Sequence, residues 1–314
     1  MQTNLAPVCL FVYNRLEETK QTIKALQNNF LAPKSHLYIF SDGSKNENSR
    51  SKVQAIRNYI HSIKGFKNVH VFESKTNKGL ATSIIDGVTK IINEYNNVIV
   101  LEDDLITTPN FLNFMNQALE FYEFDKKIKS VNGFSLDIKS KIDSVYFQTR
   151  PFPWGWATWK DRWNQQIFDK KRISDELETD KLILKKFNKK CGDDMSKMLL
   201  NSLNEINDSW YVRWTYSHFI NNKISVYPSR SFIENIGFSA DSTHCGPIDS
   251  YKYKLEVRQN INLSLIDFDS INLKEEKNFL KYFTISYKLL FRLKLLLTLK
   301  GFKLVLKELK FKIK

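Results

Sequence analysis

The first half of the chain alternates between short apolar runs and longer amphipathic segments. The apolar runs predict strands at 8–13, 37–40, 69–72 and 98–101. Segments of helical periodicity lie between them at 16–29, 51–63 and 79–95. A fourth helix is expected to begin at Thr108, with its hydroxyl as the cap and Pro109 as the first helical residue. This order of elements indicates an α/β fold with a mostly parallel sheet and helices on both faces.

The second half is less regular. Aromatic residues gather at 147–163 and 210–219, a charged helical stretch covers 171–190, and 237–248 is a polar loop. From 278 onward, apolar residues alternate with lysines, which is typical of a basic amphipathic helical tail. We therefore expect one domain at 1–250, with halves at 1–125 and 126–250, followed by a C-terminal region at 251–314.

The chain carries a net charge of +14, but this charge is unevenly distributed. Residues 274–314 contain twelve Lys and Arg against three Glu, so this tail alone carries +9. Nucleic-acid binding over the whole surface is therefore disfavoured. The tail suits an anionic membrane surface, and the alternative is a helix that packs on the domain with its lysines outward. We expect no signal peptide and no transmembrane helix, since no apolar run has the required flanks or length.

Polar side chains follow each of the predicted strands. They are Asn14 and Arg15, Asp42, the stretch 74–77, and the triplet Glu102-Asp103-Asp104. Ligands of open α/β sheets bind beyond the carboxyl ends of the strands. These residues therefore predict one site before any family is considered.

The acidic triplet 102–104 is the sharpest of these features. Three adjacent carboxylates at the end of a buried strand repel one another, and a divalent cation would relieve that conflict. Oxygen ligands favour Mg²⁺ or Mn²⁺, which often bridge to substrate phosphates. The alternative is an acidic turn that caps a helix.

The other candidates each have a structural alternative. Asp42 suits a base or ribose but also an Asx-turn, and Arg15 suits a phosphate but also a solvated first helical turn. Asn77 and Lys78 bring a polar and a basic side chain to the start of the third helix, where anions are favoured. No P-loop or dinucleotide-binding pattern is present.

Three further candidates lie in the second half. Trp156 belongs to a Trp-Gly-Trp loop suited to the apolar face of a sugar, unless the loop is core. Asp208, among aromatic residues, could act as a general base, with Glu205, Asp193 and Asp194 as competitors. His244 could reach a phosphate or metal or be structural.

Together these segments resemble the GT-A glycosyltransferases. The opening run to Arg15, Ser41–Gly43, 77–81 and 102–104 resemble family 2-like sugar transferases of bacterial surface polysaccharides. The later order of Pro109, 153–156, 208–210 and 242–244 is similar to that of the N-acetylglucosaminyltransferase I group. The resemblance covers about residues 6–246. Only one acid precedes Trp210, and the Ser-His step is one residue longer than in that group.

The resemblance implies a role for each matching residue. Asp104 would bind the metal, with His244 as a further ligand, while Glu102, Asp103 and Trp156 would contact the donor sugar. Asn14, Arg15, Asp42, Asn77 and Lys78 would contact the nucleotide. Asp208 would be the base of an inverting transfer. Residues 1–125 would then bind the donor and 126–250 the acceptor.

The resulting expectation is a metal-dependent, inverting glycosyltransferase. It would move a sugar, GlcNAc or another hexose or HexNAc, from a UDP-sugar to a lipid-linked glycan of bacterial lipopolysaccharide or capsule. Its place would be cytoplasmic and peripheral, at the inner face of the cell membrane. The alternatives are a sugar nucleotidyltransferase, which would need a Gly-rich basic loop at 14–17, and a membrane-associated glycan-binding scaffold.

Overall fold

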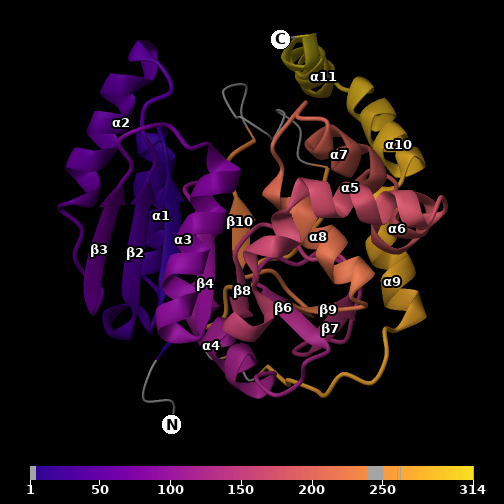
Figure 1. The fold of residues 1–314 in the computed structure, drawn as a ribbon, viewed down its shortest axis with the longest axis horizontal. Helices are drawn as coiled ribbons and strands as arrows, with labels where there is room; N and C mark the ends of the chain where they lie inside the picture. The colour runs from indigo at the N-terminus through magenta and orange to yellow at the C-terminus, as the bar shows by residue number, and fades with distance from the viewer. Residues whose placement is uncertain (1–4, 239–249, 260, 262, 314) are drawn as a thin grey trace.

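The computed structural model describes residues 5–238, 250–259, 261 and 263–313. In this part of the chain one eight-stranded sheet has the order β3-β2-β1-β4-β8-β6-β9-β7, and β10 pairs with β5 beside it (Figure 1). The strands are β1 (Val8–Val12), β2 (His36–Ser41), β3 (Asn68–Glu73), β4 (Asn97–Glu102), β5 (Leu105–Thr107), β6 (Ile128–Asn132), β7 (Val145–Gln148), β8 (Trp156–Trp159), β9 (Ile224–Pro228) and β10 (Ile233–Asn235). The helices are α1 (Leu16–Gln27), α2 (Glu47–Ile60), α3 (Leu80–Tyr95), α4 (Phe111–Phe121), α5 (Lys170–Thr179), α6 (Ile183–Cys191), α7 (Met195–Leu203), α8 (Trp210–Ile220), α9 (Leu273–Leu280), α10 (Ile285–Leu296) and α11 (Leu299–Ile313).

Strand β1 lies near the middle of the parallel block β3-β2-β1-β4. Its side chains alternate between the faces, so that Leu10 belongs to the buried cluster that includes residues of α1, α2 and α4, whereas Phe11 belongs to the cluster that includes α3. Because both faces are covered, the strand is apolar throughout and fully buried. Beyond β4 the sheet becomes mixed, since β8 runs antiparallel to both β4 and β6. The predicted α/β fold is confirmed.

The fourth helix begins later than the sequence indicates. Thr108 and Pro109 precede α4, which starts at Phe111. The N–H of Thr108 donates to the carbonyl of Phe232 at 2.9 Å, so the chain is still held beside β10 at this point. The Thr108 hydroxyl is buried and makes no hydrogen bond within the described residues. The expected cap at Thr108 and helical start at Pro109 are therefore wrong.

The C-terminal helices divide into a packed part and an exposed part. Phe279 of α9, with Tyr282 and Phe283 just after it, is buried, and the Phe279 ring lies 5.3 Å from that of Tyr227 on β9. This segment completes the core of the second half. By contrast, α10 has no buried residue, and α10 and α11 lie at the edge of the molecule (Figure 1). None of the described helices has the length and apolar character that a membrane crossing requires.

The packing of α3 on the sheet provides a test of the fold. A Cβ added at Gly87 would lie 2.7 Å from the Phe11 ring, which stacks on Phe40. We expect Gly87→Ala to lower the free energy of unfolding by about 1–2 kcal/mol, because overpacking outweighs the better helix propensity of alanine. Urea unfolding measures this change. Thr82→Ala, at an exposed position of α3, is the matched control and should change stability by less than about 0.5 kcal/mol.

Candidate active site

A cavity of about 390 Å³ lies at the carboxyl ends of β1, β2 and β4. Both halves of the chain contribute to its lining. The sequence-predicted residues in its wall are Asn14, Arg15, Asp42, Asn77, Glu102, Asp103, Asp104 and Asp208. The remaining lining residues are Phe11, Val12, Tyr13, Lys45, Gly79, Leu80, Ala81, Ser83, Trp154, Asn235 and Gly237. The edge of the sheet that the sequence indicated therefore forms a real cavity.

The acidic triplet is the electrostatic centre of this cavity. Glu102 is the last residue of β4, and Asp103 and Asp104 form the turn that leads into β5. Arg15, just after the neighbouring strand β1, donates to Asp103 and lies 2.9 Å from Asp104 Oδ2 through the same nitrogen. Removal from water and neighbouring carboxylates raise the pKa of Glu102. Removal from water also raises the pKa of Asp103, although Arg15 opposes that shift.

The excess of carboxylates over cations in the cavity suits a divalent cation that is bound by the protein and a ligand together. A single guanidinium does not neutralise three carboxylates, and all three offer the oxygen donors that Mg²⁺ and Mn²⁺ favour. Among the described residues, however, no group of three or more His, Cys, Asp or Glu has the arrangement of a metal cage. Mg²⁺ usually binds through one or two carboxylates together with substrate phosphates. The side chains present suit that shared mode of binding.

The loop after β10 fixes the position of Asp104. The N–H of Ile236 donates to the Asp104 carbonyl at 2.9 Å, and the N–H of Gly237 donates to Asn235 Oδ1 at 2.7 Å. A Cβ on Gly237 would lie 2.0 Å from Asp104 Oδ2, so only glycine allows this approach. Residues that lie more than 130 positions after the triplet thus complete its surroundings.

Asp42 shapes the cavity through hydrogen bonds to the chain itself. Its Oδ1 accepts from the N–H groups of Gly43 and Lys78, at 2.8 and 2.9 Å. Its Oδ2 accepts from the N–H of Gly79 at 2.9 Å and from the side-chain amide of Asn77 at 3.0 Å. Four donors occupy the roughly four acceptor sites of a carboxylate. Asp42 therefore holds the loop before α3 against the end of β2.

Asp208 reaches the cavity from the second half, directly before α8. Its Oδ1 accepts from Arg213 Nη2 at 2.7 Å and lies 3.9 Å from the Lys170 amine. The side chain is half exposed. Within the described residues both of these contacts use Oδ1, which leaves Oδ2 available to accept a proton. Asp208 thus lies in the cavity wall with one carboxylate oxygen held by Arg213.

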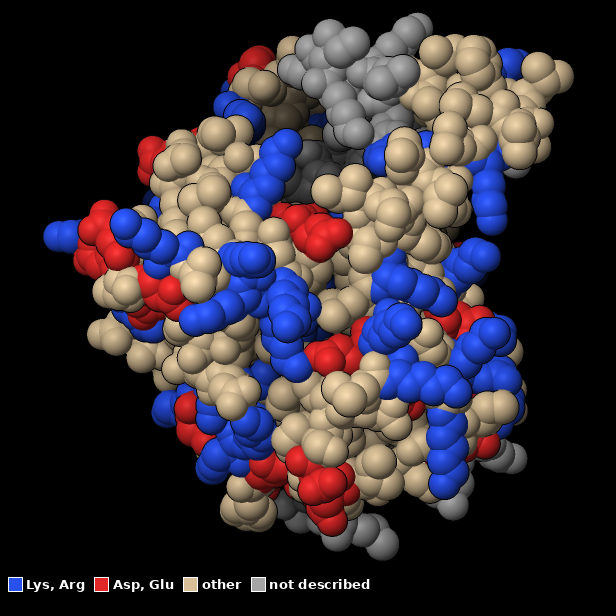
Figure 2. All heavy atoms as spheres, turned by 90° about the vertical axis from the view of Figure 1, so that its right-hand side faces the viewer, with Lys and Arg blue, Asp and Glu red and all other residues tan. Residues whose placement is uncertain are grey.

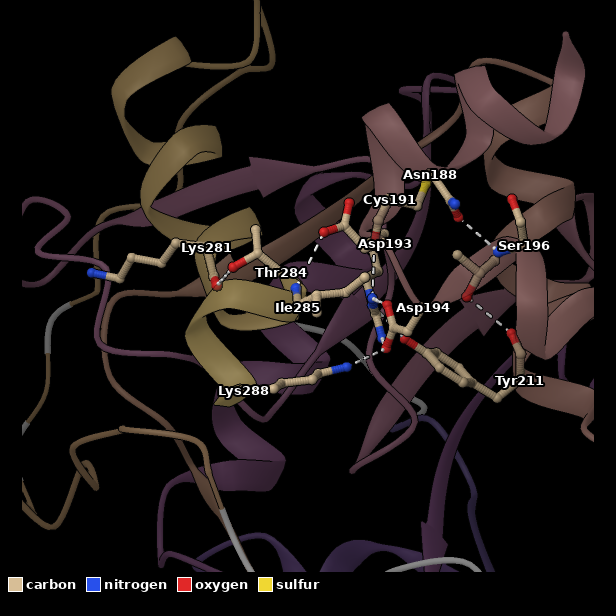
Figure 3. Close-up of polar contacts among 12 residues, drawn as sticks. Asn188, Cys191, Asp193, Asp194, Ser196, Tyr211, Lys281, Thr284, Ile285 and Lys288 are labelled. Atoms are coloured by element: carbon tan, nitrogen blue, oxygen red, sulfur yellow. Dashed lines mark hydrogen bonds and ion pairs between the residues drawn. The ribbon is translucent and has the colours of Figure 1, made fainter. Parts of the chain in front are cut away.

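The competing carboxylates are engaged elsewhere or exposed. Asp194 binds Arg150 at 2.7 Å and Lys288 of α10 at 3.3 Å, and Asp193 accepts from the N–H of Ile285 (Figure 3). Glu205 has a side chain that is 80% exposed and pairs with Lys170 at 3.5 Å. None of the three lines the cavity. The structure thus separates Asp208 from the alternatives that the sequence left open.

Two predicted contacts are corrected by the structure. Trp156 is buried on β8, where its ring stacks at 5.3 Å on Trp210 and at 5.6 Å on Trp163, so it belongs to the core. Trp154 lines the cavity in its place. The Lys78 amine pairs with Asp86 at 3.1 Å outside the cavity, and only its backbone N–H supports the site. His244 lies outside the described residues.

Sequence reasoning missed Lys45, Asn235 and Gly237. Lys45 follows β2 by four residues, and its N–H donates to the Tyr13 hydroxyl at 3.1 Å. The signal for Lys45 was its place after a strand end. For Asn235 and Gly237 the only signal in the sequence was a glycine at the start of a polar loop. The strand that positions them, β10, pairs with β5, which has only three residues and leaves no clear apolar pattern.

The fold and the cavity together define an α/β protein with an acidic site at the carboxyl ends of its parallel strands. The family model of glycosyl transferase family 2 matches residues 8–179, more than half of the chain. The chain therefore belongs to glycosyl transferase family 2. Its α/β architecture is that of a GT-A fold followed by C-terminal helices. No curated protein sequence matches the chain.

Solved structures show more distant likenesses. A mannosyltransferase from Pyrobaculum calidifontis, in complex with GDP-Man and Mn²⁺, is 10% identical with a TM-score of 0.36, over 51% of this chain and 46% of that one. S. aureus TarS is 12% identical with a TM-score of 0.29, over 41% of this chain and 22% of TarS. A UDP-glucose pyrophosphorylase complexed with UDP-glucose is 15% identical with a TM-score of 0.30, over 52% and 79%. At these scores the likenesses carry no argument about activity.

The bonds of Asp42 provide a test of its role. In Asp42→Asn an amide NH₂ would face two N–H donors in place of an acceptor oxygen. We expect the free energy of unfolding to fall by about 2–3 kcal/mol, because two charge-assisted hydrogen bonds are lost in a buried setting. Chemical denaturation measures the loss. Asp86→Asn, which removes one exposed ion pair, is the control and should cost less than about 1 kcal/mol. Equal losses in the two variants would contradict the positioning role.

Proposed function

We propose that this chain is a metal-dependent, inverting glycosyltransferase that uses a nucleotide-sugar donor. The observation that carries the proposal is that one cavity of this family 2 member is lined by an acidic strand end, Arg15 and Asp208. The first half contributes groups that suit a diphosphate, and the second half contributes a carboxylate that suits an acceptor hydroxyl. On this basis residues 1–125 bind the donor and residues 126–250 the acceptor.

The donor diphosphate binds beside Arg15 and Asp104 in the cavity wall. Mg²⁺ or Mn²⁺ bound at Asp104 would stabilise the charge that develops on the departing diphosphate. Arg15 exchanges part of its pairing with Asp103 and Asp104 for the phosphate oxygens. Glu102 and Asp103 border the sugar and ribose, and Asn14, Asn77 and Lys45 border the nucleotide. Asp42 acts on the nucleotide site indirectly, by holding the loop at 77–79.

Asp208 performs the acid–base step. Its Oδ2 accepts the proton of the acceptor hydroxyl while that oxygen attacks the anomeric carbon. The bond from this carbon to the diphosphate oxygen breaks as the new glycosidic bond forms, so one displacement inverts the anomeric centre. Arg213 holds Oδ1 and orients the carboxylate during the transfer. Trp154, in the wall of the same cavity, offers a flat apolar face to a sugar ring.

The sequence resemblance and the basic C-terminal helices support a more specific proposal for the donor, the acceptor and the location of the enzyme. We propose a UDP-sugar donor that carries GlcNAc or another hexose or HexNAc. The acceptor is a lipid-linked glycan in the synthesis of bacterial lipopolysaccharide O-antigen or capsule. The enzyme works in the cytoplasm, peripherally at the inner face of the cell membrane.

Donor hydrolysis tests the metal and the donor together. Purified protein is incubated with UDP-, GDP- and CMP-sugars in Mn²⁺ or in EDTA, and free nucleotide is measured. We expect slow release of UDP from one sugar nucleotide, lost in EDTA and at least 100-fold slower in Asp104→Asn, whose melting temperature should stay close to that of the wild type. Near-normal turnover by Asp104→Asn would refute the metal assignment. Failure of every nucleotide to bind with metal present would favour the glycan-binding scaffold.

Replacement of the base separates chemistry from donor binding. We expect Asp208→Asn to lower kcat by about 10²–10⁴-fold, because the amide accepts no proton at neutral pH, while the Kd of the donor changes less than threefold. Transfer assays and calorimetric titration of the donor measure the two effects. Glu205→Gln removes a nearby exposed carboxylate and should leave kcat unchanged. A larger loss in Glu205→Gln than in Asp208→Asn would assign the base to Glu205.

A further inference from the structure

The outward face of the C-terminal helices carries large apolar side chains. Nine of them are between 42% and 85% exposed: Ile285, Leu289, Leu290, Leu293, Leu296, Leu297, Leu299, Phe302 and Leu306. We call this set the C-terminal apolar surface. Soluble proteins rarely leave so many neighbouring apolar side chains in water, so such a surface indicates an interaction site.

The exposed residues of α10 fall on one side of the helix. At about 100° per residue, Ile285, Leu296, Leu289, Leu293 and Leu290 cover an arc of about 140°. Tyr287 and Phe291 lie on the opposite side and are partly buried, with their rings 6.3 Å apart. The helix thus uses one face to pack on the protein and presents the other to its surroundings.

The charges around this surface are almost all positive. Helices α10 and α11 contain eight Lys or Arg and one Glu, and α10 contains no acid. Lys294 of α10 and Lys303 and Lys307 of α11 are exposed. Figure 2 views this side of the molecule, where Lys and Arg side chains are abundant and the coloured atoms at the upper right are mainly tan. An apolar face bordered by lysines matches an anionic bilayer, whose headgroups attract the lysines and whose acyl region accepts the apolar side chains.

A second copy of the chain or a nucleic acid fits this surface less well. Two copies would bring two strongly basic faces together, and like charges repel. Nucleic acid would satisfy the lysines and leave the apolar arc in water. Neither helix is long and apolar enough to cross a bilayer. Binding at the surface of a bilayer would satisfy both the apolar face and the lysines.

The inward face of α10 is fixed to the protein by polar contacts. Lys288 reaches Asp194 at 3.3 Å, and the N–H of Ile285 at the start of α10 donates to Asp193 at 3.3 Å (Figure 3). Arg150 binds the same Asp194 and stacks on Phe283 at 3.6 Å. These contacts do not involve the outward side chains, so the apolar surface can be changed without removing the attachment of the helix.

We propose that α10 and α11 dock the protein on an anionic lipid bilayer through the C-terminal apolar surface and its bordering lysines. In Figure 1 both helices lie toward the end of the molecule opposite the N-terminus, the end at which the parallel strands finish and their following residues line the cavity. Docking there places the cavity on the membrane-proximal side. The proposal does not require turnover, and it supports the lipid-linked acceptor of the proposed function.

Vesicle co-sedimentation of the full chain tests the proposal. We expect binding to phosphatidylcholine vesicles containing 50% phosphatidylglycerol to be at least tenfold tighter than binding to phosphatidylcholine alone, and to weaken at high salt. The double variant Leu289→Glu/Leu293→Glu should lose at least tenfold in affinity. Lys303→Gln/Lys307→Gln should lose about tenfold for the anionic vesicles only. No binding of the wild type to anionic vesicles would overturn the proposal.

Matched controls separate docking from folding. Leu182→Glu and Leu273→Glu change leucines that are 57% and 78% exposed but lie outside the C-terminal apolar surface, so they should bind like the wild type. Equal melting temperatures would show that the Leu289→Glu/Leu293→Glu variant is folded. If that variant binds vesicles as the wild type does, or if it instead abolishes a lipid-free dimer seen by sedimentation, the surface is not a bilayer contact. Because the assay uses neither donor nor metal, its result is independent of whether the transferase activity is found.

Discussion

Buried negative charge at the end of β4 is the constraint on which the rest of the site depends. Asp103 and Asp104 are held out of water, and Arg15 is the cation that pairs with them. This pairing exists because β1 and β4 are parallel neighbours, so that their carboxyl ends meet at one edge. Gly237 also shapes it, since a side chain there would have to displace the Asp104 carboxylate. The remaining charge imbalance is what makes the cavity suited to a cation and an anionic ligand.

Asp42 shows that a carboxylate after a strand need not be chemically available. Its four donors come from the chain, so its charge is already balanced by the loop before α3. Among the described residues, no such set of four N–H donors surrounds the acids at the end of β4, and desolvation raises the pKa values of Glu102 and Asp103. Carboxylates therefore stabilise a loop at the end of β2, whereas at the end of β4 they remain suited to a ligand. Hydrogen-bond satisfaction, rather than position in the sheet, separates the two roles.

The sequence predicted the parallel block and its polar strand ends because fully buried strands leave an unmistakable apolar pattern. It could not separate Trp154 from Trp156, since which residue of a Trp-Gly-Trp loop enters a strand depends on pairing with β4, far away in the chain. It likewise could not find Asn235 or Gly237, whose place follows from the short antiparallel pair β5 and β10. The start of α4 was misplaced for the same reason, because Thr108 is held by Phe232. Local patterns predicted elements, and long-range pairing decided which side chains enter the cavity.

The polar contacts of α10 also connect the outer surface to the region around Asp208. Asp194 binds both Lys288 of α10 and the buried Arg150, and Arg150 Nε donates to the hydroxyl of Tyr211 at 2.9 Å. Tyr211 lies in the first turn of α8, three residues after Asp208. Each link is a charged or aromatic contact in a largely buried setting, so the chain of contacts is stiff. A bilayer held by the outward face of α10 would thus stand at a fixed distance from Asp208, the proposed general base. An acceptor anchored in that bilayer would gain from the fixed distance, because its hydroxyl approaches the base with less freedom to lose.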